Sequence, residues 1–102
     1  MALSDPQLID RFLEMMAAER GAAANTLAAY RRDLDQASAL LGGRLATSDE
    51  EALKSLQSGW KTLAASSVAR KAAAIRGFFN FLEDERLIAS NPARGLPNPR
   101  LQ

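Results

Sequence analysis

A chain of 102 residues is long enough for one domain with a single hydrophobic core, but too short for a core and a second catalytic lobe. Hydrophobic residues make up 47% and charged residues 25% of the sequence, as in a folded soluble protein. Cysteine and histidine are absent, which excludes disulfides and thiolate chemistry and argues against a zinc site or a histidine general base. The sequence shows neither a secretion signal nor an apolar run long enough to cross a bilayer, so a cytoplasmic protein is expected.

The net charge of +1 hides an asymmetry between the two halves of the chain. Residues 1–51 carry nine acidic and five basic residues, whereas residues 52–102 carry three acidic and eight basic residues. No Asp or Glu occurs between residues 52 and 82, although five Lys or Arg residues do. Such a split favours a local positive field, but a solvated basic face without a partner is an equally good interpretation of charge alone.

The first half of the chain predicts two amphipathic helices. Asp5-Pro6 favours a helix start, with the carboxylate as cap, and Arg20-Gly21 favours its end. A second helix is expected from Asn25, as its N-cap, to Gly42-Gly43. Apolar residues recur at three- and four-residue intervals in both segments, which predicts one buried face on each; in the second they are Leu27, Tyr30, Leu34, Ala37 and Leu41.

The second half predicts two more helices and an irregular tail. Thr47 or Ser48 is expected to cap the third helix, which ends near Ser58 because Gly59 weakens it and leaves Trp60 in a connecting turn. Ser66 or Ser67 is expected to cap the fourth, whose apolar face runs to Leu82. Prolines then allow at most a short helical turn around residues 92–94, followed by an extended linker from Leu96. The sequence therefore predicts an all-α bundle of four main helices.

Tyr30 is the only tyrosine and is considered as a nucleophile. It lies on the apolar stripe with Leu27 and Leu34, and no convincing base accompanies it. A structural role is expected, with the ring in the core and the hydroxyl at its rim.

Basic residues on the second helix give a first candidate contact with nucleic acid. Arg31 flanks the apolar stripe and Arg32 faces away from it. They could contact phosphates near the start of the helix, with a hydroxyl donor from Thr26. The alternative is ordinary surface pairing with Asp33, Asp35 or a neighbouring helix, and the residues alone do not decide between the two.

The fourth helix gives a second candidate contact. One of its faces combines small and hydrogen-bonding residues, a pattern that lets a helix lie close to a groove floor while Arg and Asn side chains reach base edges; the residues are Ser66, Ala69, Ala73, Arg76 and Asn80. Arg70 and Lys71 flank this face and suit phosphates. The alternative is a solvated face in which alanine only favours the helix, but the coincidence with the acid-free run favours binding.

These segments together resemble the N-terminal core-binding domain of tyrosine recombinases, most closely the bacterial Xer type. The resemblance covers nearly the whole sequence and includes FLEMMAAERG, then NTLAAYRRDL, then SSVARKAAAIRGFFNFLEDERLIASNPA. It implies the orthogonal, four-to-five-helix SAM-like fold of phage-integrase N-terminal domains. In that family the domain forms half of a clamp around duplex DNA, and its second and fourth helices face the DNA.

Carried onto this chain, the resemblance implies a set of DNA-binding residues: Thr26, Arg31 and Arg32 from the second helix, and Ser66, Ser67, Arg70, Lys71 and Arg76 from the fourth. It implies a core-binding domain over residues 1–90 and a proline-rich linker over residues 91–102, leading to a catalytic domain beyond Gln102. The catalytic residues of the family would lie in that domain, so no catalytic residue, metal or other cofactor is expected here. The abrupt end in the linker favours an excised fragment.

The expected partners are double-stranded DNA and other recombinase protomers, which would form a tetramer on paired sites. The resemblance departs at GWKTLAAS, where members of the family usually have a shorter glycine-containing turn. A rival hypothesis from another class is a helical protein–protein interaction module whose basic face meets an acidic partner.

Overall fold

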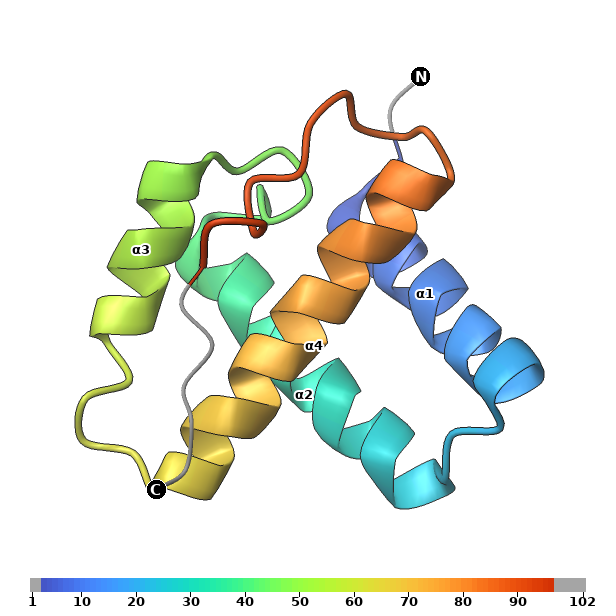
Figure 1. Ribbon diagram of the computed structural model, residues 1–102, viewed down its shortest axis with the longest axis horizontal. Helices are drawn as coiled ribbons and strands as arrows, with labels where there is room; N and C mark the ends of the chain where they lie inside the picture. The colour runs from blue at the N-terminus through green and yellow to red at the C-terminus, as the bar shows by residue number, and fades with distance from the viewer. Residues whose placement is uncertain (1–2, 97–102) are drawn as a thin grey trace.

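The computed structural model describes residues 3–96, which form four helices and no strand. The helices are α1 (Asp5–Arg20), α2 (Ala24–Leu40), α3 (Glu50–Ser58) and α4 (Ala65–Asp84). Figure 1 shows α4 crossing in front of α2, with α1 on one side of this pair and α3 on the other. The expected all-α fold is confirmed.

The core lies where α1, α2 and α4 meet. Phe12 of α1 is fully buried, and its ring contacts Phe78 and Phe81 of α4 with centroid distances of 5.9 Å each. Tyr30 of α2 stacks on Phe12 with a centroid distance of 6.5 Å, which confirms that its ring packs against the core. Gly77 allows this close approach, because a Cβ atom there would lie 3.1 Å from Cζ of Phe12. The aromatic residues therefore fix how α4 lies against α1 and α2.

The start of α1 differs from the expected one. Ser4, not Asp5, is the N-cap, and it forms a capping box with Gln7. Asp5 is buried and accepts hydrogen bonds from the backbone N–H groups of Leu45 at 2.8 Å and Ala46 at 3.0 Å. The sequence predicted that this carboxylate caps its own helix. It instead binds the loop after α2, about 40 residues further along the chain, and sequence spacing does not reveal this contact.

The other three helix starts are also one or more residues from the expected ones. Asp49 caps α3 by accepting a hydrogen bond from Ala52 N at 2.8 Å, in place of Thr47 or Ser48. Ala23 precedes α2 and Ala64 precedes α4, and neither side chain can cap. The prediction of Asn25, and of Ser66 or Ser67, as caps was therefore wrong. Alanine favours the helix strongly enough to extend both helices N-terminally past these polar residues.

The expected helix ends hold. Gly21 follows α1 and Gly42 and Gly43 follow α2, and all three have positive φ angles. Such left-handed residues favour glycine and end helices. The end of α4 is different: Arg86 has a φ of 58°, its N–H donates to Glu83 O, and Leu87 N–H donates to Leu82 O. This is a Schellman motif with arginine at the position that usually holds glycine.

The third helix and the tail complete the fold. Helix α3 ends at Ser58, and buried Trp60 lies in the turn that follows, as expected. Leu96 was expected to begin an extended linker, but its side chain and that of Ala93 are buried in the core. Figure 1 shows this segment passing between α3 and the loop after α2. The linker was expected over residues 91–102, and its part from residue 97 to residue 102 lies outside the described residues.

Candidate nucleic-acid interface

The face of α4 with small and hydrogen-bonding residues is accessible to solvent. Ser66 and Asn80 are exposed, while Ala69, Ala73 and Arg76 are half-buried. The opposite side of the helix is buried in the core and includes Ala72, Ala74, Ile75, Phe78 and Phe79. We call the accessible set (Ser66, Ala69, Ala73, Arg76 and Asn80) the α4 stripe. It reaches from the first turn of the helix to its last, where Asn80 Oδ1 accepts a hydrogen bond from Asn91 Nδ2 at 2.9 Å.

The first turns of α2 and α4 differ from those of α1 and α3. Neither α2 nor α4 has a side-chain cap or an acidic residue in its first turn. Helices α1 and α3 have both a side-chain cap and at least one carboxylate there. The N–H groups and the positive dipole end of α2 and α4 are therefore left without a local anion. Both helices begin along the lower edge of Figure 1, α4 toward its left and α2 toward its right, so the two ends lie along one edge of the molecule but apart from each other.

The predicted residues of the first turns lie at these ends. Thr26 of α2 and Ser66 of α4 are exposed, and Ser67 is half-buried. Neither Ser66 nor Ser67 makes the N-cap hydrogen bond that was expected of one of them, and no side chain caps α2. Hydroxyls beside free backbone N–H groups suit a phosphate oxygen.

The two arginines of α2 have different surroundings. Arg31 Nη2 lies 2.8 Å from Asp10 Oδ1 of α1, and both side chains are about half exposed. A pair this exposed contributes about 0–1 kcal/mol and exchanges easily for another anion. Arg32 is exposed. The pairing of Arg31 with a neighbouring helix was one of the alternatives left open by the sequence.

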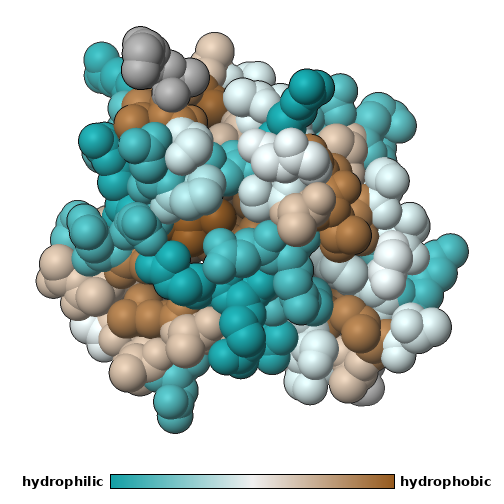
Figure 2. Space-filling view, turned by 180° about the vertical axis from the view of Figure 1, so that it is seen from behind, coloured by the Kyte–Doolittle hydropathy of each residue, from teal (hydrophilic) through white to brown (hydrophobic). Residues whose placement is uncertain are grey.

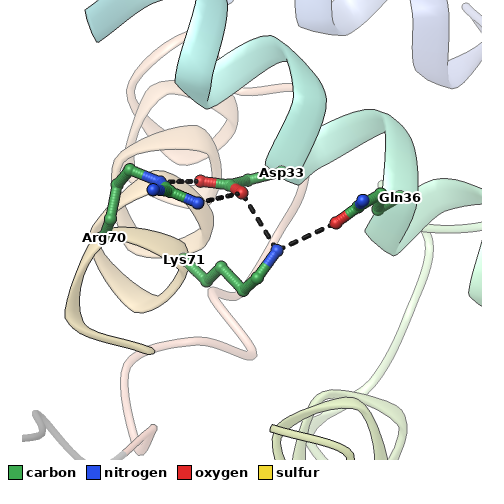
Figure 3. Close-up of polar contacts among 4 residues, drawn as sticks. All are labelled: Asp33, Gln36, Arg70 and Lys71. Carbon is green, nitrogen blue, oxygen red and sulfur yellow. Dashed lines mark hydrogen bonds and ion pairs between the residues drawn. The ribbon is translucent and has the colours of Figure 1, made fainter. Parts of the chain in front are cut away.

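Arg70 and Lys71 of α4 meet a buried carboxylate of α2, as Figure 3 shows. Arg70 donates from Nε to Asp33 Oδ2 at 2.7 Å and from Nη2 to Asp33 Oδ1 at 3.0 Å. Lys71 Nζ donates to Asp33 Oδ1 at 3.0 Å and to Gln36 Oε1 at 2.9 Å. We call these four residues the Asp33 cluster. It joins the two helices that were expected to face DNA.

The contacts within the cluster shift the pKa values of Asp33 and Arg70. Burial raises the pKa of the Asp33 carboxyl, but hydrogen bonds from Arg70 and Lys71 and their positive charges outweigh it and hold this pKa below its usual value. The hydrogen bond to Asp33 raises the pKa of the Arg70 guanidinium above its usual range. Asp33 and Arg70 are therefore both charged at neutral pH, and with the formal charge of Lys71 the cluster carries a net charge of +1.

The two cations of the cluster differ in accessibility. The Arg70 side chain is 40% exposed, whereas that of Lys71 is only 13% exposed. Arg70 has five N–H donors and uses two of them here, so its outer edge remains available to an anion. The geometry of Lys71 favours a structural role, since its ammonium already has two partners and little contact with solvent.

Asp33 is the residue of this region that the sequence interpretation treated only as a surface partner for Arg31 or Arg32. Its position gave a signal, because Asp33 lies three residues after Tyr30 and four before Ala37 and so shares their buried face. A carboxylate on a buried face needs a cation nearby. The pattern did not say that this cation comes from α4.

The side of the molecule opposite to that in Figure 1 is mixed in character. In Figure 2, hydrophilic residues spread across the middle of the surface, and hydrophobic residues show as separate patches between them. A large hydrophobic interface needs a contiguous apolar area, which this view does not show. Among residues 3–96, no group of acidic side chains could hold a metal ion, and no helix is long and apolar enough to span a membrane.

Fold and sequence together define the class of this chain. Residues 9–86 match the family described as the phage integrase N-terminal SAM-like domain, and the chain belongs to this family. The individual relatives are tyrosine recombinases of the Xer type. The chain is 56% identical over 94 residues to tyrosine recombinase XerC of Erythrobacter litoralis, an alignment that covers 92% of this chain and 30% of that protein.

More distant relatives agree with this assignment. Tyrosine recombinase XerD of Rhizobium meliloti is 42% identical over 97 residues, which cover 90% of this chain and 31% of that protein. Tyrosine recombinase XerC of Herpetosiphon aurantiacus is 36% identical over 101 residues, which cover 93% of this chain and 33% of that protein. The chain thus spans about a third of the length of these relatives. No solved structure matches it.

Proposed function

We propose that this chain is the DNA-binding domain of a site-specific tyrosine recombinase, which clamps duplex DNA and positions a catalytic domain for strand cleavage and rejoining. Membership of the phage-integrase N-terminal family supports the function. The observation that carries it is the pair of uncapped, acid-free first turns of α2 and α4 along one edge of the molecule. Backbone N–H groups and positive dipole ends arranged in this way attract phosphates.

Side chains near these two ends would supply the remaining contacts. Arg32 and Arg70 are accessible cations suited to the phosphate backbone. Arg76 lies on the α4 stripe among small residues, which suits contact with base edges in a groove. Thr26, Ser66 and Ser67 would donate hydroxyl hydrogen bonds, and Arg31 would exchange Asp10 for a phosphate.

The rest of the proposed activity concerns the whole recombinase. Because the relatives are about three times as long as this chain, the reaction would be performed by a catalytic domain beyond it. We propose that the domain itself has no catalytic residue and needs no cofactor, and that protomers assemble as a tetramer on paired DNA sites. Such a protein would act in the cytoplasm, where bacterial DNA lies.

Titration of a short fluorescent duplex with this chain, followed by anisotropy at several low salt concentrations, tests the proposal. We expect the affinity to fall steeply with salt, with nonspecific Kd values of about 10⁻⁴–10⁻⁶ M at physiological salt. Arg32→Ala should weaken binding equally for unrelated sequences and reduce the logarithmic salt slope by about 1.

Arg44→Ala is the matched control. Arg44 is also exposed, but it follows the opposite end of α2. The Arg44→Ala substitution should leave the logarithmic salt slope of DNA binding unchanged. Absence of binding at low salt would refute DNA binding and leave the rival interpretation, a module for an acidic protein partner. Equal effects of the two substitutions would instead refute the proposed face.

A further inference from the structure

The Asp33 cluster places an acidic side chain between the two helices that are proposed to bind a polyanion. A carboxylate at this position should repel DNA phosphates and weaken binding, unless it also has a role that favours binding. Asp33 is buried, with 3% of its side chain exposed, and two of its hydrogen bonds go to the same guanidinium. A bidentate bond of this kind fixes the plane of the guanidinium as well as its position.

The outer edge of Arg70 is what this arrangement presents to solvent. Nε and one N–H of Nη2 are directed to Asp33, so the donors that remain belong to Nη1 and to the second N–H of Nη2. The side chain is 40% exposed and lies in the second turn of α4, next to the uncapped start of that helix. The exposed donors and the helix end are therefore close along the same element.

We propose that Asp33 is a positioning residue for the binding of a DNA phosphodiester: its carboxylate holds the Arg70 guanidinium so that the outer N–H groups meet a phosphate oxygen already oriented. This inference rests on the proposed function. Its advantage is entropic, because a long arginine side chain loses rotamer freedom when it binds, and here that loss occurs on folding.

Lys71 completes the arrangement by balancing charge. Its ammonium contacts the Asp33 carboxylate and Gln36 and is largely withdrawn from solvent. The negative charge of Asp33 and the positive charge of Lys71 offset each other. The charge of Arg70 is then left for the phosphate, so the carboxylate orients the arginine without neutralising it.

The test compares two substitutions that each remove one negative charge from α2. Asp35 is exposed on the same helix, two residues further along. Removing its charge in Asp35→Asn should tighten binding to a short duplex slightly, as for any acid near DNA. Asp33→Asn should instead weaken binding by about 3- to 10-fold, as expected when one side chain must be ordered on binding. Tighter binding by both variants would overturn the inference.

A second comparison separates positioning from a general structural effect. If Asp33 acts through Arg70, its substitution has nothing to act on once Arg70 is gone. The double variant with Arg70→Ala and Asp33→Asn should therefore bind no more weakly than Arg70→Ala alone. An equal loss from Asp33→Asn in both backgrounds would show that Asp33 acts elsewhere, and would overturn the inference.

Circular dichroism at the temperature of the titration shows whether Asp33→Asn is folded. If it is not, Arg70→Lys replaces it, because lysine keeps the charge and one bond to Asp33 but cannot hold a second edge toward a phosphate. Arg70→Lys should bind about 3- to 10-fold more weakly than the unchanged chain, and equal binding would overturn the inference. Failure of the unchanged chain to bind DNA would refute the proposed function and the inference together, which distinguishes that result from all the others.

Discussion

At the scale of single residues, two buried carboxylates connect parts of this domain that are distant in sequence. Asp5 accepts hydrogen bonds from the loop after α2, and Asp33 binds Arg70 and Lys71 of α4. Both have their charge compensated by donors, as burial of a carboxylate requires. Removing such a carboxylate leaves the donors unpaired, so its effect on stability exceeds that of a surface ion pair.

Because of Asp33, the free energy of unfolding should depend on pH in the acid range. Its pKa is lower in the folded chain than the ordinary value of 3.8, so the unfolded chain binds a proton first as the pH falls. The stabilisation by the cluster is complete above about pH 4 and is lost as the pH falls through the lower, folded-state pKa. We expect Asp33→Asn to lower the free energy of unfolding at pH 7 by about 1–3 kcal/mol, a range reduced because Arg70 is partly exposed.

Urea unfolding of the unchanged chain and of Asp33→Asn between pH 7 and pH 2 measures this effect. The difference between the two unfolding free energies should shrink below pH 4. Asp35→Asn serves as the control and should change stability by less than about 0.5 kcal/mol at pH 7, as exposed substitutions do. A difference for Asp33→Asn that stays constant down to pH 2 would contradict the ionic account of the cluster.

At the scale of helices, hydrophobic periodicity predicted the four elements, while their starts were misplaced. Periodicity predicts helices because each helix buries one face, and apolar residues spaced three and four positions apart lie on that face. The starts of α2 and α4 were wrong because polar residues that often cap, such as Asn25 and Ser66, lie inside these helices. A cap requires a particular backbone conformation at one residue, and alanines before both sites allow the helix to begin earlier.

The end of α4 provides a test at this scale. Arg86 has the left-handed conformation that disfavours any residue with a Cβ atom, and it is exposed. Arg86→Gly should raise the free energy of unfolding by about 0.5–1 kcal/mol, because glycine adopts this conformation without strain but loses more backbone entropy.

Thermal and urea unfolding of Arg86→Gly and Arg86→Ala would separate backbone strain from loss of the side chain. Alanine retains the Cβ atom, so Arg86→Ala should give no such gain. If both variants were stabilised equally, the arginine side chain and not the backbone would be responsible.

At the scale of the whole molecule, helical periodicity predicted the all-α fold class, and the resemblance of particular segments indicated the family. Neither predicted the contacts between distant segments. The bond from Arg70 to Asp33 joins positions 37 residues apart. Leu96 packs on the core, although the sequence predicted an extended linker from this residue. Such contacts depend on how the helices are placed in three dimensions, which periodicity within one helix does not encode. The accessible α4 stripe could be predicted because it is the complement of the buried face of the same helix.

The most direct measurement of the central claim is an NMR titration of the isotope-labelled chain with a short DNA duplex at low salt, following each backbone amide. The account predicts that the largest shifts occur in the first turns of α2 and α4 and along the α4 stripe, with small shifts in α1 and α3. It also predicts that the Arg70 Nε–Hε signal moves with them. Shifts concentrated on α1 or α3, or an unchanged spectrum at saturating DNA, would contradict the claim that α2 and α4 form the DNA-binding face.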